Sequence, residues 1–100
     1  MEKEYYFVGT ELKLALDIDC EGFTMDDDPW KAVFSKGQKS IVCDAEHNSV
    51  KRDGQWYVLV DTGVIGKGQY ELTVEIDVPD PDFSDGYRHE TWRKMVINVR

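Results

Sequence analysis

Residues 53–88 read DGQWYVLVDTGVIGKGQYELTVEIDVPDPDFSDGYR, and this stretch decides the fold of the chain. Its opening pair, Asp53-Gly54, is a strong hairpin signal, because both residues tolerate the positive φ that a tight turn needs. Segment 69–78 then alternates between apolar and polar side chains. Such alternation predicts a strand with one face in a core and the other in water. The stretch therefore predicts antiparallel β-structure.

Further strands are predicted on both sides of this stretch. Segment 11–20, ELKLALDIDC, alternates without a break. Segment 54–61 is apolar on both faces, which indicates a central strand or one whose outer face meets a neighbour. The remaining strand candidates are residues 4–8, 30–36, 38–43 and 88–99.

For the last candidate, residues 88–99, the sequence also predicts which side chains share a face. Period two places Met95, Ile97 and Val99 on one face of that strand, and Trp92 and Val96 on the other.

Turn signals separate these strands. Glycines follow Glu21, Lys36, Asp53 and Asp85, and Asp61 or Thr62 is expected to cap a short helical turn. About seven short strands at this spacing predict an all-β, antiparallel β-sandwich of Ig-like architecture. The label is architectural only, because the short Cys20-to-Cys43 span does not reproduce the Ig pattern of Cys, Trp and Cys. We expect one domain, residues 1–100.

The composition limits the classes of partner. The chain of 100 residues has 20 acidic and 12 basic residues and a formal net charge of −8. No basic stripe offsets this charge, which argues against binding to DNA or RNA. No apolar run reaches membrane-spanning length, and the first residues lack the apolar core of a signal peptide. We therefore expect no membrane partner, and a cytoplasmic or virion-associated location.

The two cysteines have two readings. In a chain that is not exported, Cys20 and Cys43 are expected to be reduced thiols, and a disulfide between them is the alternative. Neither has a second Cys or His at zinc-ligand spacing.

Carboxylates gather in the loop after residue 78. Asp80, Asp82 and Asp85 could supply oxygen ligands to Ca²⁺, which would be the only cofactor. The EF-hand pattern fails, because Asp85 stands where that loop needs glycine and Thr91 where it needs glutamate. The favoured alternative is that the aspartates form local turn hydrogen bonds and stay in water.

Nothing in the chain resembles a catalytic motif. The serines lack a nucleophile-elbow context, and His89 and Glu90, as neighbours on a strand, point to opposite faces. Since no motif supplies a nucleophile together with a base, we expect the protein not to be an enzyme.

Aromatic side chains exceed what one small core needs, so some should be exposed and available to a partner. Phe83, in contrast, is expected to tuck under its loop. The candidates for a binding surface are Tyr5, Tyr6, Phe7, Tyr57 and Tyr87.

The stretch 53–88 resembles a pattern in small Ig-like β-sandwich modules of bacteriophage and prophage tail, baseplate and fibre proteins. In that pattern a strand ending in Asp-Thr leads to a Gly-x-Gly turn, an alternating strand and an acidic Pro-Asp loop. The matching positions are Asp61, Thr62, Gly66, Gly68, Pro79, Asp80, Asp82, Phe83, Asp85, Gly86 and Arg88. Residues 9–19 are similar to the first core strand of such modules, whereas the middle, residues 23–52, has no counterpart.

The resemblance implies a non-enzymatic structural module that binds other protein chains, or copies of itself, in a phage-type assembly. Exposed edges at residues 5–8 and at the last strand would be natural places for a neighbouring strand to add. The alternative is a surface adhesion or carbohydrate-binding module that uses aromatic side chains and a calcium-binding acidic loop.

Overall fold

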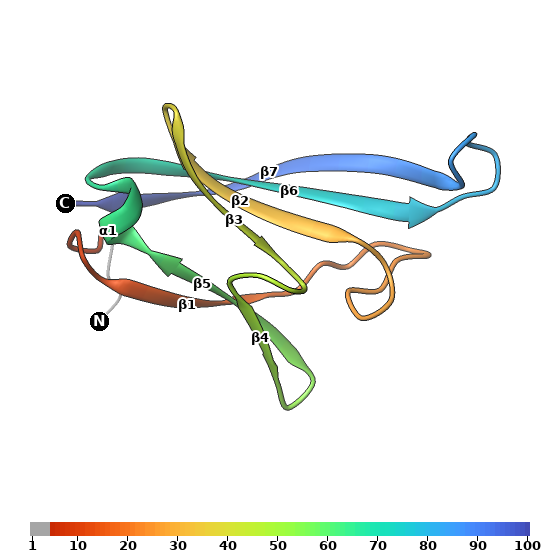
Figure 1. The fold of residues 1–100 in the computed structure, drawn as a ribbon, viewed down its shortest axis with the longest axis horizontal. Coiled ribbons are helices and arrows are strands. Elements are labelled where there is room, and N and C mark those ends of the chain that lie inside the picture. The colour runs from red at the N-terminus through yellow and green to blue at the C-terminus, as the bar shows by residue number, and fades with distance from the viewer. Residues whose placement is uncertain (1–4) are drawn as a thin grey trace.

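A computed structural model describes residues 5–100, without the side chains of Lys94 and Met95. Two antiparallel sheets make up the fold (Figure 1). One has the strand order β1-β5-β4 and the other the order β3-β2-β6-β7. The elements are β1 (Glu11–Leu16), β2 (Trp30–Lys36), β3 (Lys39–Asp44), β4 (Ser49–Arg52), β5 (Gln55–Asp61), α1 (Thr62–Ile65), β6 (Gly68–Pro79) and β7 (Tyr87–Val99). The predicted all-β, antiparallel class is confirmed.

One core lies between the two sheets, and the alternation of β6 shows how the sequence builds it. Every apolar position of that strand is buried, from Tyr70 to Val78, while the intervening positions are exposed or half-buried. Each such buried side chain contributes about 1.5–3 kcal/mol relative to an exposed one. The three-stranded sheet adds side chains such as Leu12, Val58 and Val60 to the same core.

Two tight turns set the register of the hairpins. Asp53 and Gly54 have φ of 51° and 79°, so both central residues of the β4–β5 turn are left-handed, as in a type I′ turn. Gly37 has φ of 61° at the first position of the two-residue β2–β3 turn, as in type II′. The predicted Asp-Gly hairpin is therefore confirmed, and the central position of β5 between β1 and β4 agrees with its two apolar faces.

The first alternating segment makes a shorter strand than expected. β1 ends at Leu16, and residues 17–20 continue without strand pairing. The predicted strand 4–8 is, over its described residues, a single parallel bridge between Tyr6 and Val99. There Tyr6 N–H donates to the Asn98 carbonyl (2.8 Å), and Arg100 N–H donates to the Tyr6 carbonyl (2.7 Å). The segment around Tyr6 thus covers the end of the β7 edge.

A bulge interrupts the pairing of β6 with β7. Glu71 lies opposite Val96 and Thr73 lies opposite Arg93, so two residues of β7 face one residue of β6 between these pairs. One extra residue in a strand shifts the side-chain parity on its far side.

This bulge overturns the expected parity of the last strand. Trp92 lies opposite Val74 and packs, half-buried, against the core, on the same side as buried Ile97. Val96 does point outward, with 57% of its surface exposed. The expectation for Met95 lies outside the described side chains.

The molecule is elongated, with principal extents of 45 × 32 × 24 Å. Figure 1 shows the chain ends and α1 at one end of the long axis, and the β6–β7 loop at the other. Within residues 5–100, no helix has the length and apolarity that a membrane span requires.

Candidate functional site

The acidic loop between β6 and β7 holds two of its carboxylates in place. Asp80 accepts a hydrogen bond from the backbone N–H of Asp82 (3.0 Å) and pairs with the Arg88 guanidinium (3.2 Å). Asp85 accepts a hydrogen bond from the backbone N–H of Tyr87 (3.0 Å). These contacts are those of turn residues that cap the chain locally.

His89 links the loop to the strand before it. Its Nδ1 contacts Asp77, and its Nε2 lies 2.8 Å from Asp85 Oδ2. These hydrogen bonds, first that to Asp77 and then that to Asp85, raise the pKa of the His89 imidazole. The Tyr87 backbone N–H, and then His89, lower the pKa of Asp85. These contacts of His89 therefore connect β7 with the end of β6 and with the acidic loop at the tip of this hairpin.

The described residues include no group of three or more His, Cys, Asp or Glu side chains arranged to hold a metal ion. Calcium binding by Asp80, Asp82 and Asp85 stays a prediction. A calcium titration tests it, because a ligand that binds only the folded state raises the melting temperature.

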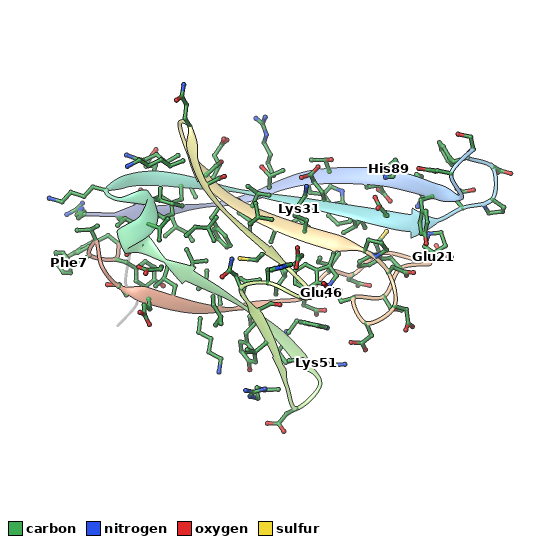
Figure 2. All side chains as sticks on the ribbon, viewed as in Figure 1. Phe7, Glu21, Lys31, Glu46, Lys51 and His89 are labelled. Atoms are coloured by element: carbon green, nitrogen blue, oxygen red, sulfur yellow. The ribbon has the colours of Figure 1, made fainter. Side chains whose placement is uncertain are left out.

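The aromatic candidates do not form one surface. Tyr5 and Phe7 meet edge to face at 5.4 Å near the chain ends, and the Arg100 guanidinium lies 4.3 Å from the Tyr5 ring centre. Tyr6, between them, is half-buried against the core. Figure 2 shows Phe7 at this end of the molecule, whereas His89 lies along β7 toward the other.

The other two candidates lie elsewhere. Tyr57 is half-buried in β5, with Lys13 Nζ 4.8 Å from its ring centre. Tyr87 is exposed beside the acidic loop. Phe83, expected to tuck under that loop, is instead 48% exposed: its backbone N–H donates to the Asp80 carbonyl (3.3 Å) and its carbonyl accepts from Gly86 N–H (2.9 Å), but its ring stays largely in water.

Both cysteines are free thiols. Burial raises the pKa of the Cys43 thiol to about 11. Burial, and then a hydrogen bond to Glu90 (3.6 Å), raise the pKa of Cys20. A raised thiol pKa lowers the population of the nucleophilic thiolate, so neither side chain is prepared for covalent chemistry.

A groove of about 870 Å³ opens beside the free edge of β3. Its apolar lining includes three exposed side chains, Val42 of β3, Leu59 of β5 and Val64 of α1, with exposed fractions of 40%, 37% and 58%. The pairing of β4 with β5 ends at Val58, and one more hydrogen bond follows it, from Leu59 N–H to the Asn48 carbonyl (2.8 Å). The last residues of β5, beyond Leu59, are uncovered on this side. The groove thus exists because β4 is short.

The groove wall formed by β3 has unused backbone groups. The two-residue turn at Gly37 and the register with β2 direct the N–H and C=O groups of Ser40, Val42 and Asp44 away from the sheet. Asn48 Nδ2 donates to the Val42 carbonyl (2.9 Å), and Asp44 N–H donates to the His47 carbonyl (2.9 Å). Among the described residues, the Ser40 N–H, the Ser40 C=O and the Val42 N–H have no hydrogen-bond partner of this kind from the chain.

Two carboxylates stand together at the α1 end of the groove. Glu11 of β1 and Asp61 of β5 are direct cross-strand partners, and both are exposed. Asp61 Oδ1 accepts a hydrogen bond from Gly63 N–H (2.8 Å), which makes it the N-cap of α1, one of the two residues that the sequence offered for this role. Like charges opposite one another destabilise a sheet, so this pair favours a nearby positive charge.

The sequence did not reveal the groove. Its lining comes from β1, β3, β5 and α1, which only the folded chain brings together. The sequence held one signal of it. Leu59 and Val64 are apolar, yet neither lies on the face of its segment that packs into the core.

Comparisons of the chain with protein-family models, with curated proteins and with solved structures found no match.

Proposed function

We propose that this domain is a non-enzymatic module that binds another protein chain in the β3–β5 groove. The observation that carries the proposal is the coincidence of an apolar lining with an unpaired strand edge. Either feature alone is common, but together they offer both buried area and backbone hydrogen bonds to a protein ligand.

The proposal includes Ig-like architecture, which three features support. The order β1-β5-β4 opposite β3-β2-β6-β7 corresponds to Ig strands B-E-D and C′-C-F-G. Trp30 is buried on β2, the counterpart of strand C. Tyr70, near the start of β6, donates from its hydroxyl to the carbonyl of Gly66, close to that of Thr62, as in a tyrosine corner.

We further propose that the module works within a phage- or prophage-type assembly. Support for this comes from the sequence pattern of residues 53–88, whose acidic loop and Asp-Thr corner lie at opposite ends of β6. Binding to the products of neighbouring genes tests this part, with light scattering to detect copies of the chain binding one another. A monomer that binds none of those products contradicts it.

A pair of matched variants tests the groove. Random short peptides are selected for binding to the wild-type domain, and their affinities are measured for Val42→Lys and Val96→Lys. Both valines are exposed on edge strands, but only Val42 lines the groove. We expect Val42→Lys to abolish binding and Val96→Lys to preserve it, with equal melting temperatures. Equal binding by both variants would place the ligand elsewhere and contradict the proposal.

A further inference from the structure

We infer that the occupant of the groove is an extended segment of another protein that pairs as a strand with β3 and carries a basic side chain toward α1. This inference rests on the proposed function and specifies its partner.

The first step is the backbone. Ser40 and Val42 lie two residues apart on β3, and their outward N–H groups have the spacing that an added strand uses. Asn48 and His47 already occupy the outward groups toward the far end of β3. The edge that remains open therefore begins at Val42 and runs toward the β2–β3 turn.

The second step is the side chains of the occupant. Leu59 and Val64 line the groove beside this open edge, and α1 lies against β3. Side chains on one face of an added strand would contact these two residues, and those on the other face would meet water. The occupant should therefore alternate between apolar and polar residues.

The third step is charge. Glu11 and Asp61 face each other without a cation among the described side chains. The two basic side chains that line the groove have other contacts. Lys13 lies over the Tyr57 ring, and His47 pairs with Asp44. A lysine or arginine of the occupant at the α1 end would relieve the repulsion between the two carboxylates.

Hydrogen exchange tests the backbone step. The probe is a synthetic peptide of alternating valine and threonine with arginines at one end. On saturation, we expect exchange of the Ser40 and Val42 amides to slow by about tenfold or more. The amides of Ile41 and Cys43 already bond within the sheet and should change little. If the peptide shifts the NMR resonances of groove residues but does not slow hydrogen exchange at Ser40 and Val42, the strand model is overturned and the proposed function stands.

Charge variants test the partner's chemistry. Glu11→Gln should weaken binding of the arginine peptide about two- to fivefold, as expected for an exposed ion pair. It should also raise the melting temperature of the free domain slightly, because it removes one charge of an opposed pair. Glu21→Gln is the matched control, since Glu21 is exposed at the other end of the molecule (Figure 2).

A peptide with glutamates in place of the arginines completes the series. We expect it to bind more weakly than the arginine peptide, and equal affinity of the two would overturn the basic partner. If light scattering shows a dimer, and the same amides are protected from exchange without peptide, then the occupant of the groove is a second copy of this chain. If no peptide, selected or designed, contacts the groove, then the proposed function itself fails.

Discussion

Tyr70 shows how a single side chain fixes the corner that begins β6. Its ring is fully buried, and its hydroxyl donates to the carbonyl of Gly66, just after α1, and lies 3.2 Å from the carbonyl of Thr62, at the start of α1. The hydroxyl therefore ties the short helix, which forms one end of the groove, to the core. Burial, and then the charge of Asp61, raise the pKa of this tyrosine, so it stays a donor at neutral pH.

Replacing Tyr70→Phe should lower the free energy of unfolding by about 1 kcal/mol, because the half-buried Gly66 carbonyl loses its donor while the ring is kept. Urea unfolding measures the change. Tyr87→Phe is the control, since Tyr87 is exposed and its hydroxyl can bond water. Equal effects of the two substitutions would contradict the role assigned to the Tyr70 hydroxyl.

His89 gives the hairpin tip a pH dependence. The pKa of the imidazole is raised above its ordinary value of 6.5 by Asp77 and then by Asp85. A raised pKa in the folded state stabilises the protein below the unfolded value, and this contribution is lost as pH rises through the folded value. The lowered pKa of Asp85 acts in the opposite sense, with stability lost as pH falls below its ordinary value of 3.8.

We therefore expect the unfolding free energy of the wild type to fall from about pH 6 to about pH 8 relative to that of His89→Gln. Urea unfolding at a series of pH values checks this. His47→Gln is the control, because His47 contacts Asp44 at a separate place. Parallel pH profiles for wild type and His89→Gln would show that the histidine contacts do not stabilise the fold.

These contacts also show why the loop was harder to interpret from sequence than the strands. Sequence spacing brought Asp80, Asp82 and Asp85 together as candidate ligands. It did not show that the β6–β7 register sets His89 opposite Asp77, or that Arg88 reaches Asp80. The partners of a carboxylate depend on register, which the alternation pattern alone does not give.

At the scale of the element, the bulge in β7 decides which side chains reach the core. Trp92 and Ile97 stand an odd number of residues apart, so an unbroken strand would expose one of them. The residue inserted between Arg93 and Val96 lets both face inward. Alternation predicted the strand correctly, but it could not locate the bulge, because the bulge satisfies packing against β6.

Deleting Lys94 should remove this extra residue and leave Trp92 and Ile97 four residues apart, so that an unbroken strand keeps both facing the core. We therefore expect the deletion to lower the unfolding free energy by about 1 kcal/mol or less. Deleting Lys94 together with Met95 is the comparison. It leaves an odd spacing, so either Trp92 or the pair Ile97 and Val99 must leave the core, with an expected loss of about 2 kcal/mol or more. Thermal unfolding compares the two deletions, and equal losses would contradict the packing role of the bulge.

At the scale of the whole molecule, the sequence predicted what depends on local pattern. Six of the observed strands and the Asp53-Gly54 hairpin follow from alternation and turn chemistry, and Asp61 is one of the two caps that the sequence offered. β4 was not predicted as a strand, and the predicted strand at residues 4–8 is a single bridge over its described residues. The groove depends on how far β4 pairs along β5 and on where β3 passes β5, which are properties of the assembled sheets. Its residues are spread from β1 to α1, so no single segment signalled it.

The arrangement of edges bears on where a neighbouring strand would add. The sequence favoured residues 5–8 and the last strand, and a bridge between Tyr6 and Val99 joins these two segments at the end of β7. The open part of β3, beside the groove, combines a free edge with apolar side chains. We therefore centre the proposed protein-binding function on β3.

Mapping by NMR of the amide shifts that selected peptides cause tests this central claim most directly. We expect the largest changes at Ser40, Val42, Leu59 and Val64, with little change at the acidic loop around Asp85. Shifts centred on the acidic loop or on the aromatic side chains near the chain ends, with the groove unchanged, would contradict the account.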